Sequence, residues 1–317
     1  MLINDRIYGK AKITLPVIVE LIKSKPIQRL KGICQFGVPD ELYNQKNYNR
    51  FEHSIGVMIL LKKLGASEEE QIAGLTHDAS HTAFSHVIDW VVSDGGAEEE
   101  QDRQHEKFIY SSKISPILIK YGYSSKRIAN CHNFKLLEDK IPNICADRLD
   151  YAFREFPKSI ADKCLQSLLI KKGRLVFKGS VPALLFANNY LGKQKNHWGS
   201  FEAASRYRLL ADVIREAMTD KILSLSDFWQ DDKYILRKIK KSKNPKIKKL
   251  LGVLRKKSLS SLPKSNLVVY KKFRYVDPIF LSNNKLVRLS KVNNNFKHRL
   301  ESNRNYNKRG IIIPSII

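Results

Sequence analysis

The sequence predicts a mainly α-helical protein that ends in a small, basic α+β region. Apolar residues recur at helical spacing through the first 230 residues, and no period-two pattern there is long enough for a large sheet. Beyond Pro263 the pattern changes, because residues 267–270 and 286–289 are short apolar runs between asparagine-rich turns and resemble strands. We therefore predict a helical core over residues 1–230 and a basic α+β appendage over residues 231–317.

The first helices are predicted from apolar faces and from the positions of proline and glycine. Residues 13–24 carry one apolar face, and Pro16 fits the first turn of that helix. A second helix is expected to follow Pro26. Residues 51–64 carry a further apolar face, after which Gly65 favours a helix end.

The next predicted helix opens with a capping pattern and ends at a charged pair. Ser67 followed three residues later by Glu70 resembles a capping box, and the helix is expected to end near His77 and Asp78. Adjacent residues inside a helix diverge by about 100° of arc and do not share a face. At a helix end both can face one metal ion, so we expect this pair to contribute to a site in the core of a helical bundle.

The remaining elements are predicted more coarsely. The polar stretch over residues 94–103 is expected to be a loop near that site. Further helices are predicted over residues 201–225, 233–241 and 245–257.

The positive charge of the chain is concentrated near its end. The 317 residues carry a net charge of +26, and residues 231–317 hold 24 Lys and Arg against 4 Asp and Glu, compared with 33 against 27 in residues 1–230. A solvated tail and a surface for polyanions such as nucleic acid both account for this distribution. Within residues 270–275 three aromatic residues alternate with three basic ones, a pattern that suits base stacking beside phosphate contacts.

The composition predicts a soluble, cytoplasmic protein. Hydrophobic residues make up 43% of the chain, enough for a substantial core. No apolar run approaches the roughly 18 residues that a membrane helix needs, and the first residues lack the features of a signal peptide. The four cysteines are widely spaced without any Cys-x-x-Cys, so we expect reduced thiols instead of a disulfide framework or a zinc cage.

Four residues form a candidate metal site. His53, His77, Asp78 and Asp147 supply imidazole and carboxylate donors, which suit a divalent transition metal that polarises phosphate oxygen and activates water. A single histidine is more often a buried structural residue than a ligand. Here three histidines and two aspartates lie within residues 77–89, which are too many titratable groups for a packed core and favour a catalytic site.

The other histidines lack such a context. His132, His197 and His298 have no partner motif, and we expect structural or surface roles for them.

The motif residues resemble those of a known family. The run Arg50-Phe51-Glu52-His53-Ser54, then His77-Asp78, then Asp147-Arg148 resembles the HD-domain phosphohydrolases, in the branch that contains dNTP triphosphohydrolases of the SAM-and-HD-domain type. The similarity extends from about Asp5 through Glu155. The resemblance implies an HD-domain helical bundle and a homo-oligomer. It also implies that a Mn, Fe, Zn or Ni ion is bound by the four candidate ligands, with Mg as a further ion at nucleotide phosphates.

The resemblance also assigns roles to residues around the metal. It places His81, His86, Asp89 and His105 beside the scissile phosphate. An imidazole can protonate a leaving oxygen at neutral pH, and His81 or His86 is the expected donor. Asp89 follows His86 by three residues and could orient it, although an exposed or capping acid is the alternative.

Substrate contacts are implied at five further positions. Arg50, Arg148 and Tyr151 match positions that bind phosphate, and Gln35 and Glu155 match positions that read the sugar.

Two departures from the family pattern alter the expected pocket. Ser80 stands where the family usually has glycine, and Glu155 stands where it has aspartate. Nucleotide hydrolysis is therefore better supported than specificity for deoxynucleoside triphosphates.

We expect a metal-dependent phosphohydrolase that converts a dNTP to deoxynucleoside and triphosphate. The alternatives are another nucleotide phosphomonoesterase, a nuclease, or a nucleic-acid-binding protein whose HD site is regulatory.

Overall fold

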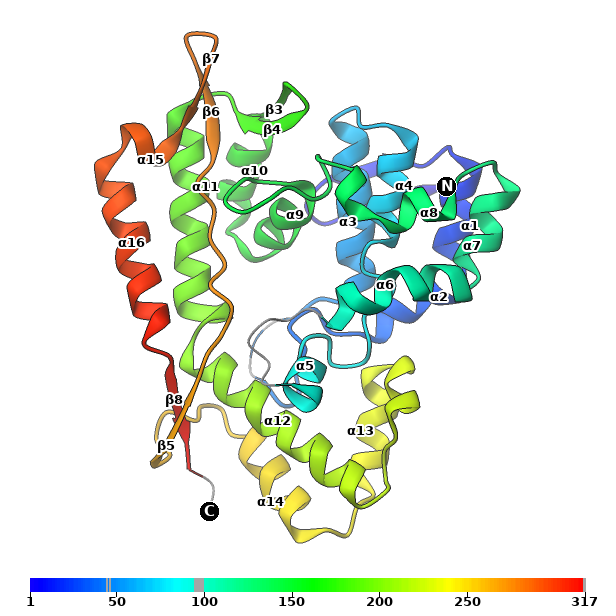
Figure 1. Cartoon of the computed structure of the whole chain (residues 1–317), viewed down its shortest axis with the longest axis vertical. Helices are drawn as coiled ribbons and strands as arrows, with labels where there is room; N and C mark the ends of the chain where they lie inside the picture. Colours follow the sequence, from blue (N-terminus) through cyan, green and yellow to red (C-terminus); the bar gives the residue numbers. More distant parts are fainter. Residues whose placement is uncertain (44, 46, 94–99, 316–317) are drawn as a thin grey trace.

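The structure, a computed structural model, describes residues 1–43, 45, 47–93 and 100–315. Helices dominate it, which confirms the predicted mainly α class. Helix α3 (Arg50–Lys63) packs against α9 (Ala146–Glu155) between the helices of the N-terminal part and those of the C-terminal part (Figure 1).

The chain begins with a short hairpin and two helices. Strands β1 (Leu2–Asp5) and β2 (Gly9–Lys12) pair antiparallel. They precede α1 (Pro16–Lys23) and α2 (Lys25–Arg29), which confirm the two helices predicted there. Pro16 begins α1, where a missing backbone N–H leaves no helical hydrogen bond unmade.

The two helices that follow are fixed by N-terminal caps. The side chain of Asn49 accepts a hydrogen bond from the backbone N–H of Glu52 at the start of α3. Ser67 caps α4 (Glu68–Thr76) in the same way through the N–H of Glu70, as its sequence predicts. Helix α4 ends at Thr76, so the His77-Asp78 pair lies at a helix end.

The rest of the helical part is a series of mostly short helices. They are η1 (Leu30–Gly32), α5 (Val87–Val92), α6 (Glu100–Ser111), α7 (Ile114–Lys120), α8 (Ser125–Ala129), η2 (Cys131–Asn133), α10 (Lys158–Gln166), α11 (Ser180–Lys193), the π-helical turn η3 (Gln194–Trp198), α12 (Phe201–Thr219), η4 (Leu225–Trp229), α13 (Asp232–Lys240) and α14 (Pro245–Leu254). Among the described residues, no helix combines the length and the apolar character needed to cross a membrane.

The loop predicted over residues 94–103 is only partly described. Residues 94–99 lie outside the described residues, whereas residues 100–103 form the first turn of α6 and not a loop. The backbone N–H of Glu100 donates to Asp89 Oδ1 at 2.9 Å. This helix start therefore uses a carboxylate eleven residues away, beyond the range of local capping patterns.

The C-terminal residues complete sheets and cover helices of the preceding part. The remaining elements are β3 (Leu168–Lys171), β4 (Arg174–Phe177), β5 (Lys264–Val269), β6 (Ile279–Ser282), β7 (Lys285–Arg288), α15 (Leu289–Val292), α16 (Asn294–Lys308) and β8 (Ile311–Pro314). One sheet has the order β3-β4-β6-β7, and β5 pairs with β8. In the first sheet Phe177 pairs in parallel register with Phe280.

The predicted boundary after residue 230 does not coincide with a break in packing. Phe280, Phe296 and Leu300 belong to the same buried cluster as residues of α3 and α9. Most basic side chains of this region are exposed or partly exposed, while many of its apolar side chains enter the core. The change in charge after residue 230 therefore marks a more basic surface and not the start of a separate core.

A close approach of α3 to α9 depends on Gly56. A Cβ atom at this position would collide with Arg154 Nη2 and Asp150 Oδ1, both buried on α9. We expect Gly56→Ala to lower the free energy of unfolding by about 1–3 kcal/mol or more, as overpacking does in cores. Chemical denaturation measures the change.

The matched control for that substitution is Gly252→Ala on α14. A Cβ atom there meets open space, and alanine favours helix more than glycine does, so we expect unchanged or slightly higher stability. Equal stability of Gly56→Ala and the wild type would contradict the close packing of α3 on α9.

Candidate metal centre and active-site cavity

Three side chains from three helices meet at one point. His53 lies on the second turn of α3, His77 follows α4, and Asp147 lies on the first turn of α9. His53 Nε2 is 3.0 Å from Asp147 Oδ1 and 3.2 Å from His77 Nε2, and His77 Nε2 is 3.6 Å from Asp147 Oδ1. The structure thus brings together donors that are 94 residues apart in the chain.

These separations suit ligands of one small cation. Protein nitrogen and oxygen ligands lie about 2.0–2.2 Å from a transition metal, so two of them on one ion are roughly 3.0–3.5 Å apart. The three measured distances fall close to that spacing. The residues present therefore fit a divalent metal.

Hydrogen bonds to the far ring nitrogens orient both imidazoles. His53 Nδ1 is 2.8 Å from Asp150 Oδ2, and His77 Nδ1 is 2.8 Å from the carbonyl oxygen of Gly74. A carboxylate or carbonyl oxygen only accepts, so each Nδ1 carries a proton, and in the neutral imidazole, which is the form that binds a metal, each Nε2 presents a lone pair. Partners of this kind fix the tautomer of metal-binding histidines.

Asp78, the fourth predicted ligand, lies slightly farther from the same two imidazole nitrogens. Its Oδ1 is 3.5 Å from His77 Nε2, and its Oδ2 is 3.8 Å from His53 Nε2. Oδ2 also accepts from Arg50 Nη1 at 2.6 Å. The guanidinium is oriented in turn by Ser85, whose Oγ accepts from Arg50 Nε at 2.7 Å.

The electrostatics of the centre favour bound positive charge. Burial lowers the pKa of His53, but hydrogen bonds to Asp147 and Asp150 outweigh burial and raise it to about 9. Burial raises the pKa of Asp147, whereas His53 and His77 hold it well below its usual range. A divalent cation between these groups would supply positive charge in place of an added proton.

Behind the centre lies a buried ion-pair network that sequence reasoning missed. Arg154 Nε donates to Asp150 Oδ2 at 2.7 Å, and Arg154 Nη2 donates to Asp5 Oδ2 at 2.8 Å. The network links β1, α9 and His53 of α3. Its signal in the sequence is weak, because Asp150 and Arg154 are four residues apart on a helix, as in ordinary surface pairs.

His81 and His86 lie beside the centre in different environments. His81 Nε2 is 3.3 Å from Asp78 Oδ1 and is almost fully buried. Burial and the neighbouring charge of Arg50 keep the pKa of His81 well below its usual range. His86 is more exposed, and its Nδ1 lies 3.4 Å from Asp89 Oδ2.

His105 enters the cavity from α6. Its Nδ1 is 3.0 Å from the hydroxyl of Ser80, the residue that departs from the family's glycine. Its Nε2 is buried and has no hydrogen-bond partner among the described residues. Burial lowers the pKa of His105 to about 4. Ser80 therefore positions a neutral imidazole with one nitrogen available to a ligand.

The centre opens into a cavity of about 790 Å³. This volume lies within the usual range of small-molecule sites. Most predicted site residues line it, whereas Asp89 lines a smaller adjoining hollow with His81. Gln35 is on the cavity wall, and its Oε1 is buried without a hydrogen-bond partner among the described residues. An aromatic wall faces the same space and includes Phe36, Tyr48, Tyr151, Tyr190, Trp198 and Tyr275.

Glu155 orders part of that aromatic wall. Its Oε2 accepts from His197 Nδ1 at 2.7 Å, and its Oε1 accepts from Trp198 Nε1 at 2.7 Å. His197, for which a structural or surface role was expected, lines the cavity through this contact, and His132 lines it as well. Their roles depend on contacts between distant segments, which single histidines in a sequence do not reveal.

Arg148 and Tyr151 differ from their implied phosphate contacts. Arg148 Nη2 donates to Glu138 Oε1 at 2.6 Å, and its Nη1 donates to backbone oxygens of Asp139 and Asn143. Arg148 lines the cavity, but these bonds already engage its guanidinium. The Tyr151 hydroxyl is hydrogen-bonded to that of Tyr190, although its ring lines the cavity.

A segment from the C-terminal region forms another wall. Residues 271–275, here called the crossing segment, connect β5 to β6 and run beside α11 (Figure 1). Lys271, Lys272, Arg274 and Tyr275 line the cavity. The three basic residues of the predicted pattern, but only one of its three aromatic residues, therefore face the candidate active site.

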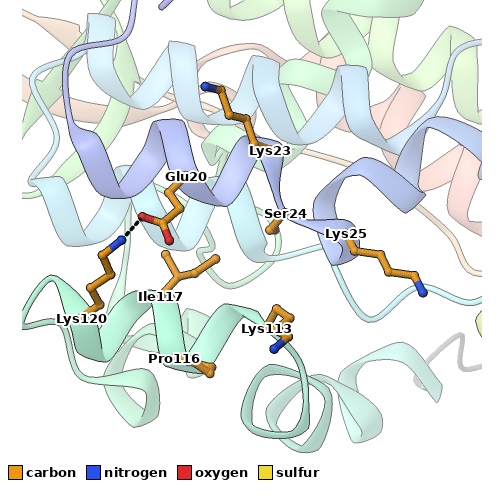
Figure 2. Close-up of a pocket in the computed structure, with 8 residues that line it drawn as sticks. All are labelled: Glu20, Lys23, Ser24, Lys25, Lys113, Pro116, Ile117 and Lys120. Atoms are coloured by element: carbon orange, nitrogen blue, oxygen red, sulfur yellow. Dashed lines mark hydrogen bonds and ion pairs between the residues drawn. The ribbon is translucent and has the colours of Figure 1, made fainter.

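Another hollow lies on the surface between α1, α2 and α7. Figure 2 shows Glu20 paired with Lys120 at 2.7 Å, while Lys23 and Lys25 extend in different directions. Its one carboxylate is already paired with an ammonium group, so this hollow offers no converging ligand set.

Comparisons with known proteins agree with this geometry. The family model of the HD domain matches residues 50–154, which contain all four predicted ligands. The uncharacterized protein YdhJ of Bacillus subtilis is 34% identical over 99% of this chain and 98% of its own length. The metal-dependent phosphohydrolase cns2 of Cordyceps militaris is 35% identical over 72% of each chain.

Two further similarities are more distant. The deoxynucleoside triphosphate triphosphohydrolase SAMHD1 homolog of Dictyostelium discoideum is 27% identical over 90% of this chain and 62% of its own length. A crystal structure of a hypothetical protein from Aquifex aeolicus has a TM-score of 0.64 at 17% identity, covering 94% of this chain and 93% of that one, and supports the fold alone. The motif match and the two alignments, which cover 99% and 72% of the chain, show that it belongs to the HD domain family of metal-dependent phosphohydrolases.

Proposed function

We propose that this phosphohydrolase acts on nucleotides and converts a deoxynucleoside triphosphate to deoxynucleoside and triphosphate. The observation that carries the proposal is the convergence of His53, His77 and Asp147 at a cavity whose walls are aromatic and basic. Aromatic faces suit a base, and basic side chains suit phosphates.

The metal-binding residues proposed here are His53, His77, Asp78 and Asp147. A mixed set of imidazoles and carboxylates suits Mn, Fe, Zn or Ni. When bound, the metal supplies polarisation of a phosphate oxygen and a lower pKa for water. Mg at the nucleotide phosphates is a further possibility raised by the family resemblance.

The residues around the centre would complete the reaction. Water loses a proton to the solvent as its oxygen bonds to the α-phosphorus, the bond from phosphorus to the 5′-oxygen breaks, and that oxygen takes up a proton from a histidine. We assign the donor to His86, because it is more exposed than His81 and pairs with Asp89. Arg50 would hold a phosphate oxygen, and His105 Nε2 would donate to another.

The sugar would lie against Gln35 and the aromatic wall. The buried Oε1 of Gln35 can accept a hydrogen bond from a sugar hydroxyl, which would give it the partner it lacks. Glu155 would act indirectly, by holding His197 and Trp198 in the wall. Arg148 would contact phosphate only after exchanging its bond to Glu138.

The relatives' names support the proposed reaction class and the proposed substrate to different degrees. The phosphohydrolase of Cordyceps militaris supports the reaction class, and the triphosphohydrolase homolog of Dictyostelium discoideum supports the substrate. The lower identity of the latter makes the triphosphate specificity the finer part of the proposal.

A nucleotide panel tests the proposed function. The full chain, loaded in turn with Mn, Fe, Zn or Ni, is incubated with dNTPs, ribonucleoside triphosphates, deoxynucleoside monophosphates and single-stranded DNA. We expect the dNTPs to be cleaved fastest. Preferential cleavage of monophosphates or of DNA would instead support a phosphomonoesterase or a nuclease.

The proton donor gives a separate prediction. His86→Gln should lower kcat by about 10²–10⁴-fold, because glutamine cannot give a proton to the leaving oxygen. Metal content should not change, since His86 is not among the proposed ligands. Steady-state kinetics across pH and metal analysis measure both effects.

The control for this variant is His298→Gln on the exposed face of α16, for which we expect wild-type kinetics. A His86→Gln enzyme with unchanged kcat would remove His86 from the mechanism, and His81→Gln would then be the variant to measure.

Binding of nucleic acid and assembly into a homo-oligomer are two further predictions. Basic side chains are exposed along α13 and α14, where nucleic acid could bind through its phosphates. A homo-oligomer is implied by the family resemblance.

A further inference from the structure

The crossing segment is held in place by side chains from two helical elements. The backbone N–H of Arg274 donates to Gln194 Oε1 at 3.2 Å, and Asn307 Nδ2 donates to the carbonyl oxygen of Lys271 at 3.0 Å. Gln194 Nε2 in turn donates to Asn307 Oδ1 at 3.2 Å. Gln194 is only 3% exposed, so these bonds are sheltered from water and fix the path of the segment along the cavity.

Lys271 anchors the same segment by a different interaction. It is buried, and its Nζ lies 3.4 Å from the ring centroid of Tyr207. A cation placed over an aromatic face is attracted by the ring. Lys271 thus has a structural role, and the two following basic residues, Lys272 and Arg274, stand on the cavity wall.

The positive charges of Lys272 and Arg274 influence the pKa values of groups on two different helices. Burial raises the pKa of Asp102 on α6, and the charge of Lys272 opposes that rise. Burial also raises the pKa of Tyr151 on α9, and Arg274 is among the charges that oppose it. The two basic residues therefore lie within electrostatic reach of both α6 and α9.

Two cations near the metal centre are engaged by acidic partners. Arg50 is bound to Asp78, and Arg148 is bound to Glu138. A nucleotide triphosphate brings several negative charges into the cavity, which the metal and Arg50 would neutralise only near the reacting phosphate. Further positive charge is needed for the phosphates beyond it.

We propose that Lys272 and Arg274 bind the phosphates beyond the reacting one, so that the crossing segment makes this site selective for nucleotides with a polyphosphate chain. The inference rests on the proposed function, because it specifies which nucleotides the proposed active site would bind. It assigns part of the active site to the basic C-terminal region.

The direct test uses inorganic tripolyphosphate and the metal-loaded full chain. Lys272→Gln with Arg274→Gln should weaken tripolyphosphate binding by about 10–100-fold in calorimetry, as expected for the loss of hydrogen bonds to charged groups. The matched control, Lys285→Gln with Lys291→Gln, removes the same charge at exposed positions outside the cavity and should bind like the wild type. Equal affinity of the two double variants, or no binding by the wild type, would overturn the inference.

Kinetics distinguish this inference from the proposed function. In the crossing-segment variant we expect KM for a dNTP to rise by about 10–100-fold, while hydrolysis of p-nitrophenyl phosphate, which has no polyphosphate chain, changes little. If the wild type cleaves no dNTP but its tripolyphosphate binding depends on Lys272 and Arg274, the proposed function fails and the phosphate site stands. If dNTPs are cleaved with the same KM by wild type and variant, the phosphate site fails and the proposed function stands.

A single substitution guards against a folding defect in the double variant. Lys272 is exposed, so Lys272→Glu should keep the thermal midpoint of the wild type and still weaken tripolyphosphate binding. Unchanged binding by this charge reversal would overturn the role of Lys272.

Discussion

Replacing both His77 and Asp78 with alanine is expected to abolish metal retention and to lower nucleotide hydrolysis by about 10³-fold or more. The substitution removes an imidazole that lies 3.2 Å from His53 Nε2 and a carboxylate that faces both imidazoles, so two of the four proposed ligands are lost together. Metal content measured by mass spectrometry and initial rates with a dNTP give the two readouts.

The control for that variant removes the same residue types at the surface. Neither His298 nor Asp162 lines the cavity, so we expect His298→Ala with Asp162→Ala to retain metal and activity. A His77→Ala, Asp78→Ala protein that keeps its full metal content would show that the metal is bound elsewhere.

Asp150→Ala is expected to have the largest effect on stability. Asp150 is fully buried between His53 and Arg154, and its removal leaves a buried guanidinium with one carboxylate partner fewer. Breaking a buried pair in this way costs about 3–5 kcal/mol. Loss of the carboxylate behind a metal-binding histidine also lowers metal affinity by about 10–100-fold. Urea denaturation and metal titration measure the two effects.

An exposed pair of the same helical spacing provides the comparison. Lys158 and Asp162 are paired at 2.7 Å on the surface of α10, and Asp162→Ala should cost less than about 1 kcal/mol. Similar losses for Asp150→Ala and Asp162→Ala would contradict the structural role assigned to the buried network.

Local patterns identified the elements that carry the metal centre. The side chains of Asn49 and Ser67 start α3 and α4, and the end of α4 leaves His77 and Asp78 at a helix terminus. Capping depends on residues three positions apart, so the sequence could predict the second of these caps together with the helix end that follows it.

Other parts of the site depend on contacts between distant residues. Gln194 holds Arg274 across 80 positions of the chain, and no local pattern indicates that contact. Arg148 is a related case. It lines the cavity, as its position after Asp147 suggested, but no local pattern indicates that its guanidinium is bound to Glu138 and to backbone oxygens.

The distribution of charge predicted which part of the chain has a basic surface, but it did not predict which residues pack in the core. The basic residues after position 230 suggested an appendage, yet Phe280 and Phe296 share a core with α3 and α9. Charge patterns report which faces meet water, while core membership depends on the apolar residues between them.

Product identification by phosphorus NMR tests the central claim most directly. The metal-loaded full chain is incubated with a dNTP in water enriched in oxygen-18. We predict inorganic triphosphate and deoxynucleoside as the only products, with the heavy oxygen on a terminal phosphorus of the triphosphate and none formed by His77→Ala, Asp78→Ala. Release of single phosphates or of pyrophosphate, or an intact dNTP, would contradict triphosphohydrolysis at this centre.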